Sequence, residues 1–223
     1  MSYKPKLLEI GAELPMRLLV EGSDGFHTLC NLFIHHGLPK NAFGIKEKHG
    51  YTGILDTLAE ELKKADLKTL GIVIDADEDL PARWQSLRDR LIEFGYRDPD
   101  FPKKPDPTGF VIPPQADLPD IGIWMMPDNQ LPGILENFIS LLIPDHATNP
   151  SWQYALQCVD GIPNGYQHFP AVRKPKAQLH TWLAWQKEPG KPIGQAIAAS
   201  YFNPDSKAAL TFIAWIKHLF QLT

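Results

Sequence analysis

Acidic side chains follow two apolar segments of the chain. Glu21 comes directly after the apolar run of residues 16–20, MRLLV. Asp75 and Asp77 come at the end of a second run, the β-branched stretch TLGIVID of residues 69–75. If the two runs are neighbouring parallel strands, their carboxylates share one small volume at the carboxyl edge of the sheet. Open α/β sheets bind their ligands at that edge, so these three residues are the first candidates for chemistry.

Carboxylates this close together favour a divalent cation. Like charges raise one another's pKa and repel, so such a cluster is costly unless a cation is present. Several hard oxygen ligands suit Mg²⁺ or Mn²⁺ rather than zinc. An ion held in this way orients and neutralises a phosphate, so the predicted chemistry is phosphoryl transfer or phosphodiester cleavage.

The same residues also have a purely structural interpretation. Asp-rich turns are common after strands because Asp caps the following helix, and DADEDLPARW at residues 75–84 contains a helix start. A Glu-Gly pair after a strand is an ordinary turn as well. The two acidic segments in this order, each closing an apolar strand, favour the chemical interpretation.

Strands alternating with amphipathic helices surround the acidic segments. Further strands are predicted at residues 43–46, 109–114 and 120–127. Helices are predicted at residues 26–36, 54–65, 82–95 and 134–143. Ser23 or Asp24 is expected to cap the first of these helices. The alternation predicts an α/β fold with βαβ units, a mostly parallel sheet and helices on both faces.

The pattern changes after Pro144. The rest of the chain predicts helices alone, at residues 152–159, 176–185, 193–199 and 207–219. We therefore expect an α/β domain at residues 1–144 and a C-terminal helical extension at residues 145–223. The extension should pack on the sheet, because a free-standing unit of this size would be marginal. Its tryptophans suit a homodimer surface as well as they suit a core.

Two motifs resemble the Toprim domain of bacterial primases, topoisomerases, small ribosomal-RNA maturases and OLD-family nucleases. They are LLVEGSDG at residues 18–25 and GIVIDADED at residues 71–79. In that domain a glutamate ends the first strand and an Asp-x-Asp pair ends a later one. The resemblance covers roughly residues 16–143, and the C-terminal helices look like those of a group of stand-alone Toprim-like proteins.

The resemblance implies a role for each matching residue. Glu21 matches the glutamate that serves as general acid/base or metal ligand, and Asp75 and Asp77 match the pair that binds Mg²⁺. The segment PGILENF is similar to the Gly-x-Glu element of primase and maturase Toprim domains. The further matches are Gly22 in the turn, Asp24 just after it, and Glu136 in PGILENF.

Four other side chains are candidates with strong structural alternatives. Asp79 extends the acidic run as a possible metal ligand, and it also stands where a helix cap is expected. Asp128 follows the last strand in an ordinary Pro-Asp-Asn turn. Lys176 or Arg173 would supply the positive charge that a phosphodiester transition state needs, although basic residues are also common on solvated helix faces.

Composition narrows the class of protein and its partners. The 223 residues are 43% hydrophobic and 22% charged, as in ordinary globular proteins, and the net charge of −4 does not suggest a duplex-DNA binder. Cys30 and Cys158 lie singly in apolar surroundings, which predicts neither a disulfide nor a zinc site. The sequence has no signal-peptide pattern and no apolar run of membrane-spanning length. We expect a cytoplasmic protein without membrane contact.

Two functions from different classes remain open. The first is a Mg²⁺- or Mn²⁺-dependent nuclease or related phosphotransfer enzyme acting on nucleic acid, with Glu21 as acid/base. The second is a non-catalytic Toprim-fold module that binds a protein partner or a nucleotide, for example in a defence or toxin-type system. The acidic constellation favours the first, and the acidic net charge favours the second. Phosphate-loop, dinucleotide-binding, HExxH and nucleophile-elbow motifs are absent from the sequence.

Overall fold

A five-stranded sheet carries the two acidic segments. The computed structural model of the chain describes residues 14–115 and 117–223. The expected domain of residues 1–144 therefore includes residues that lie outside the described part. The strands are β1 (Met16–Glu21), β2 (Gly44–Lys48), β3 (Thr69–Asp75), β4 (Phe110–Val111) and β5 (Asp120–Met126).

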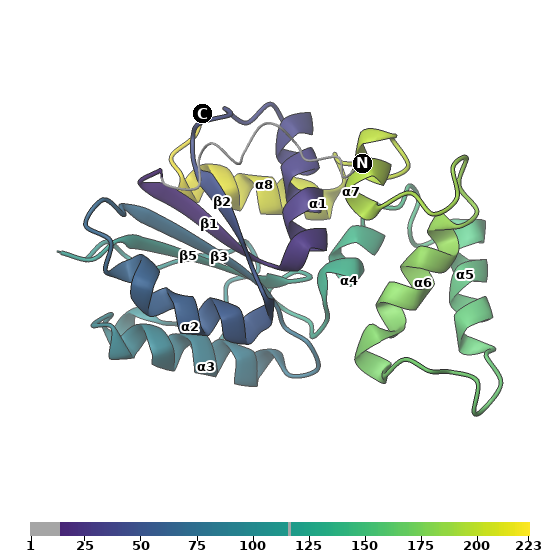
Figure 1. Cartoon of the computed structure of the whole chain (residues 1–223), viewed down its shortest axis with the longest axis horizontal. Coiled ribbons are helices and arrows are strands. Elements are labelled where there is room, and N and C mark those ends of the chain that lie inside the picture. Colours follow the sequence, from purple (N-terminus) through teal and green to yellow (C-terminus); the bar gives the residue numbers. More distant parts are fainter. Residues whose placement is uncertain (1–13, 116) are drawn as a thin grey trace.

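The strand order is β2-β1-β3-β5-β4 (Figure 1). Strands β2, β1, β3 and β5 are parallel, and the short edge strand β4 pairs antiparallel with β5. Val20 of β1 lies beside Val73 of β3, so the carboxyl ends of these two strands are adjacent. The predicted α/β fold with a mostly parallel sheet is confirmed, and so is the neighbouring placement of the two acidic strands.

Helices cover both faces of this sheet. Those of the first 144 residues are α1 (Gly22–His35), α2 (Gly50–Leu62), α3 (Leu80–Glu93) and α4 (Leu135–Ser140). Those that follow are α5 (Pro150–Asp160), α6 (Lys174–Leu183), α7 (Ile193–Ala198) and α8 (Lys207–Leu219). Within the described ranges, no helix is both long and apolar enough to cross a membrane.

Alternating side chains of the strands divide the core in two. Leu18 and Val20 of β1 face the cluster formed with α1 and α8, and Leu19 faces the cluster formed with α2 and α3. Figure 1 shows α1 and α8 on one face of the sheet and α2 and α3 on the other. The carboxyl ends of the strands are left uncovered by these four helices, which is where a ligand can reach them.

A pair of glycines makes room for α8 on the sheet. Gly71 of β3 and Gly122 of β5 lie side by side in the ladder. A Cβ atom on Gly122 would lie 2.5 Å from the tip of Leu219, and one on Gly71 would lie 2.5 Å from Leu18 and 3.0 Å from Leu219. The bare backbone of both glycines therefore lets this leucine of α8 rest against the strands. Helix α8 therefore belongs to the same core as β1 and α1.

Helices α5 and α6 form an antiparallel pair beside α4 (Figure 1). Trp152 of α5 and Trp182 of α6 are buried, and Trp215 of α8 is buried against the sheet. Trp185, just after α6, is 44% exposed and stacks on Tyr154. These three buried tryptophans are core residues, and Trp185 is the one of the four that a partner can contact.

Three of the element boundaries that differ from the sequence expectation have a local cause. Helix α1 begins at Gly22, so Ser23 and Asp24 lie in its first turn and the expected cap by either residue is wrong. Gly22 has φ +85°, which lets the chain pass from strand to helix without a linker. Helix α2 begins at Gly50, before the expected start at residue 54. Its first turn was not predicted because that turn lacks apolar periodicity. Strand β4 ends at Val111, close to two prolines without backbone N–H groups at residues 113–114.

Candidate metal and phosphate site

One pocket gathers most of the residues singled out in the sequence. It has a volume of about 320 Å³ and lies at the carboxyl ends of β1 and β3. Eight of the ten candidate site residues line it: Glu21, Gly22, Asp24, Asp75, Asp77, Glu136, Arg173 and Lys176. The parallel pairing of β1 with β3 is the reason that residues so distant in sequence meet here.

Backbone hydrogen bonds tie two of the carboxylates to neighbouring elements. The backbone N–H of Asp75 donates to Glu21 Oε2 at 3.1 Å, across the β1–β3 junction. Asp75 Oδ1 in turn accepts from the backbone N–H of Leu135 at 2.9 Å, at the start of α4. Both carboxylates are therefore held in place by main-chain donors whose positions are set by the sheet and by α4.

Burial and mutual repulsion disfavour negative charge at these two residues. Burial is the main cause that raises the pKa of Asp75 well above its ordinary value, and the nearby Glu21, Glu136 and Asp77 carboxylates raise it further. Burial also raises the pKa of Glu21, against the lowering effect of its hydrogen bond from Asp75. These two carboxyl groups therefore hold a proton more readily than ordinary carboxyl groups, and a cation bound beside them would oppose this shift.

Asp77 is paired with a cation that the sequence reasoning missed. Its backbone has φ +52°, and its N–H donates to the carbonyl of Gly133 at 2.9 Å. Its carboxylate forms an ion pair with Arg83, whose guanidinium lies 4.1 Å from the ring centroid of Tyr51. Side chains of a helix point back toward its N-terminus, so the position of Arg83 near the start of α3 is the signal that would have found it.

Lys176 of α6 joins the helical pair to the carboxylates. Its Nζ lies 2.8 Å from Asp24 Oδ2 and 3.3 Å from Glu136 Oε1. Partial burial works against its charge, but the hydrogen bond to Asp24 and the charge of Glu136 prevail and raise the pKa of Lys176. Glu136 is itself only 4% exposed, so the lysine compensates a buried carboxylate.

The pocket carries more negative than positive groups. Five carboxylates line it, and the cations are Arg173, Lys176 and, bound to Asp77, Arg83. With all of these groups ionised, two negative charges are left over, which is the charge of one divalent cation. The candidate ligands are carboxylate oxygens, as Mg²⁺ and Mn²⁺ prefer. This donor set and charge therefore fit such an ion.

The strand-end carboxylates are not drawn together around a single point. Within the described ranges, the group of three ligand atoms that all lie within 4.8 Å of one another is formed elsewhere, by His35, His36 and Asp205. Asp77 points to Arg83 instead of to Asp75, as expected for like charges without a shared cation. The carboxylate of Asp77 is thus engaged by Arg83.

A family model described as "Protein of unknown function (DUF3226)" matches residues 15–221. The chain belongs to the DUF3226 family. No curated protein and no solved structure matches it. The family match spans the sheet, the α5–α6 pair and α8, so all residues of the carboxylate pocket lie within it.

Two of the candidate residues lie outside the pocket of this DUF3226 chain. Asp79 caps α3, where its side chain accepts from the backbone N–H of Ala82 at 2.9 Å, and it lines the adjoining pocket with Arg83. The carboxylate of Asp128 accepts the backbone N–H groups of Gln130 and Leu131 in its turn. Both side chains thus have the structural role that their sequence context suggested as the alternative.

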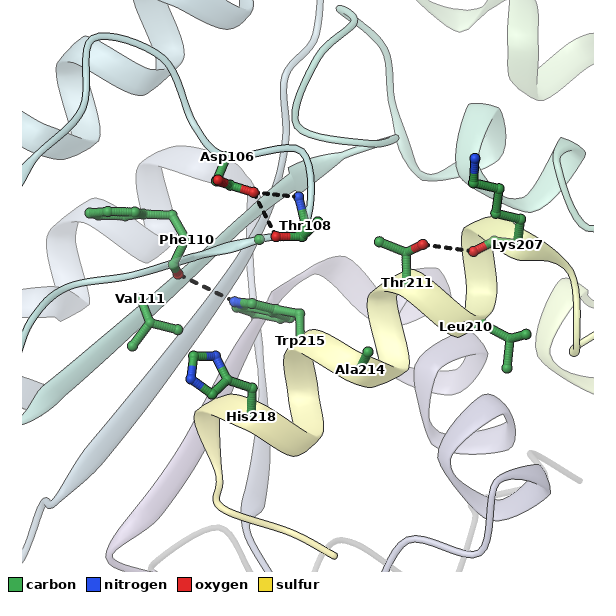
Figure 2. Close-up of a pocket in the computed structure, with 11 residues that line it drawn as sticks. Asp106, Thr108, Phe110, Val111, Lys207, Leu210, Thr211, Ala214, Trp215 and His218 are labelled. Carbon is green, nitrogen blue, oxygen red and sulfur yellow. Dashed lines mark hydrogen bonds between the residues drawn. The ribbon is translucent and has the colours of Figure 1, made fainter.

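A groove of about 860 Å³ lies between α8 and the segment of residues 106–111 that includes β4. Figure 2 shows Trp215 at its centre, with its indole N–H donating to the carbonyl of Phe110 at 3.3 Å. Asp106 at its rim accepts from Thr108 of its own loop. The titratable groups Asp106, Lys207 and His218 do not converge there, so size alone does not make this groove the chemical site.

Proposed function

We propose that this chain is a Mg²⁺- or Mn²⁺-dependent nuclease or related phosphotransfer enzyme that acts on nucleic acid through a Toprim-like carboxylate cluster. One observation carries the proposal: Glu21 and Asp75 end adjacent parallel strands in a pocket where carboxylates outnumber cationic side chains by two. A purely structural turn does not need five carboxylates around one pocket, because like charges this close together repel one another.

Asp75 and Asp77 are the proposed metal ligands, with Glu136 close enough to Asp75 to add a third carboxylate. A bound divalent ion supplies neutralisation of the phosphate oxygens. Release of Arg83 from Asp77 leaves a guanidinium beside the same pocket, where it can hold a phosphate oxygen by charge-assisted hydrogen bonds.

Glu21 is the proposed general acid/base. Its raised pKa brings its protonation closer to neutral pH, where proton exchange with a reacting oxygen is most effective. The Asp75 N–H holds the Oε2 of this carboxylate in place. Arg173 is exposed and lines both this pocket and the adjoining one, so it is available to contact the backbone of a bound strand.

The test is a cleavage assay on end-labelled single- and double-stranded DNA and RNA with Mg²⁺ or Mn²⁺. We expect metal-dependent cleavage by the wild type, and a loss of about a hundredfold or more in Glu21→Gln and Asp77→Asn. Asp128→Asn, a carboxylate outside the pocket, is the matched control and should retain activity. Cleavage that persists in both pocket variants would place the activity elsewhere.

The second candidate is a non-catalytic module that binds a protein partner. It is favoured by the ion pairs that Arg83 and Lys176 already make with the pocket carboxylates, since a guanidinium or ammonium of a partner could replace either. Absence of cleavage on every substrate, together with unchanged stability in the presence of Mg²⁺ and Mn²⁺, would make this module the better account.

A further inference from the structure

A second set of ligand-type side chains lies at the other end of α1. His35 and His36 end this helix, and Asp205 comes from the turn before α8. Each offers one nitrogen or oxygen atom, and the three atoms lie within 4.8 Å of one another. Two imidazoles with one carboxylate form a different donor set from that of the carboxylate pocket, because nitrogen ligands favour zinc and later transition ions over Mg²⁺.

The turn that carries Asp205 is fixed by hydrogen bonds. The backbone N–H of Asp205 donates to Asn203 Oδ1 at 3.0 Å, and Asn203 N–H donates to the carbonyl of Leu142 at 2.6 Å. Ser206, the next residue, caps α8 by accepting from the Ala209 N–H. The carboxylate therefore projects from a backbone that is already ordered, which lowers the entropic cost of holding a ligand.

Helix α1 is fixed on the same side of the molecule. Gly194 of α7 packs directly on it, since a Cβ at this position would stand 2.8 Å from the carbonyl oxygen of His27. Asn31, one turn further along α1, is buried and donates to the same carbonyl at 2.8 Å. The two histidines and the aspartate thus come from segments whose relative position the core determines.

Hydrogen bonding prepares one histidine for coordination. His36 Nε2 lies 2.9 Å from the carbonyl oxygen of Pro204, so it carries the proton and donates. The other ring nitrogen, Nδ1, then has a free lone pair. Metal-bound histidines commonly have such a backbone carbonyl partner on their second nitrogen.

The remaining ligands face each other. His35 Nε2 lies 3.4 Å from Asp205 Oδ1, and both side chains are exposed to solvent. The C-terminal end of a helix also carries partial negative charge, which favours a cation there. The His36–Pro204 hydrogen bond, the His35–Asp205 contact and the helix end together distinguish the cluster from an isolated surface histidine.

We propose that His35, His36 and Asp205 form a Zn²⁺ site that links the end of α1 to the turn before α8. Water completes the coordination, because three protein ligands leave one tetrahedral position open. The ion joins two residues at the end of α1 to an aspartate 170 positions after His35, and so stabilises the contact between the sheet domain and the C-terminal helices. This site does not depend on the function proposed for the carboxylate pocket.

The test is Zn²⁺ titration by calorimetry on the full chain in excess Mg²⁺, using Asp75→Asn/Asp77→Asn as the background so that the carboxylate pocket cannot take the metal. We expect one bound Zn²⁺ per chain, and a loss of affinity of about tenfold or more in His35→Ala and in Asp205→Ala. His218→Ala removes an exposed histidine of α8 and is the matched control, with unchanged affinity expected.

Co²⁺ substitution and thermal unfolding give second readouts. A visible d–d absorption band should appear with Co²⁺ in the background variant and be lost in His35→Ala, and Zn²⁺ should raise the melting temperature only where both histidines and Asp205 are present. Because His35 and Asp205 are exposed, their truncation leaves the fold intact. Equal Zn²⁺ affinity in His35→Ala, Asp205→Ala and the background, or no binding in the background, would overturn the proposal.

Discussion

At the scale of single residues, the carboxylate pocket is a place where burial and charge oppose each other. Asp75 is held by the Leu135 N–H yet lies among Glu21, Asp77 and Glu136. The pKa of Asp75 is raised in the folded protein, so without metal the folded state binds a proton that the unfolded state releases. Its contribution to folding stability is then lost as pH rises.

We predict that Asp75→Asn changes the pH dependence of stability in the presence of a chelator. Between the ordinary aspartate pKa of about 4 and the raised pKa of the folded state, wild-type stability should fall with rising pH relative to the variant. Melting temperatures of both proteins from pH 4 to pH 8 test this. A constant difference across that range would contradict the raised pKa.

Glu61→Gln is the control, because the pKa of Glu61 is lowered where that of Asp75 is raised. Glu61 is buried, and hydrogen bonds and charges from Lys46 and Lys64 outweigh its desolvation and lower its pKa. Its stabilising contribution is present above the ordinary glutamate pKa and is lost as pH falls through the lowered value. Glu61→Gln should therefore destabilise the protein at pH 7, and the difference should shrink in acid.

Arg83 is predicted to compete with the metal for Asp77. Replacing it by glutamine releases the carboxylate and removes a nearby positive charge, so Mg²⁺ should bind about fivefold more tightly. Arg88→Gln is a matched control from the same helix, because Arg88 pairs with Asp98 outside the pocket. Titration calorimetry on both variants measures the change in Mg²⁺ affinity. Weaker Mg²⁺ binding in Arg83→Gln would mean that Arg83 orders the site and does not compete with the metal.

At the scale of elements, close contacts of α8 with the sheet depend on glycine. Gly109, just before β4, has φ +95°, and a Cβ there would overlap the indole ring of Trp215. Gly95, after α3, has a similar φ of +102° with nothing within 4 Å of the same Cβ position. Both glycines therefore have a positive φ that strains other residues, but only Gly109 is packed against a side chain.

Gly109→Ala should therefore destabilise the protein by about 2–4 kcal/mol, combining backbone strain with overpacking. Gly95→Ala should cost about 1 kcal/mol from strain alone. Denaturant unfolding of both variants measures the difference. Equal losses in the two variants would mean that α8 moves away from β4 at little cost.

The elements themselves were largely predictable from periodicity. The bounds of β3 and α8 agree with the sequence expectation, because a continuous β-branched run and a regular apolar stripe define them. The meeting of Glu21 and Asp75 was expected on the condition that their two strands are neighbours, since adjacent parallel strands end at one edge, and the sheet order meets that condition. The Arg83–Asp77 pair and the seat of Leu219 on Gly71 were not predicted, since they depend on side-chain directions and on which helix covers which strands.

At the scale of the whole molecule, one core crosses the expected boundary at residue 144. Phe212 of α8 contacts the rings of Phe33, Trp124, Phe138 and Trp215, which come from α1, β5, α4 and α8. The sheet and C-terminal helices therefore share buried apolar surface, which is the main favourable contribution to folding.

The chain is predicted to unfold in a single transition. Circular dichroism and tryptophan fluorescence should give the same midpoint. Phe212→Ala should lower the free energy of unfolding by about 3–5 kcal/mol and shift both signals together. Leu210→Ala, at a 48% exposed position of the same helix, should change stability by less than about 1 kcal/mol. Separate transitions for the two signals would show that the C-terminal helices fold independently of the sheet.

The measurement that bears most directly on the central claim is Mg²⁺ and Mn²⁺ binding by calorimetry to the wild type and to Asp75→Asn/Asp77→Asn. We predict binding by the wild type and its loss in the double variant, with the fold retained by circular dichroism. Equal binding in the two proteins, or none to the wild type at millimolar metal, would contradict a metal site built on the ends of β1 and β3.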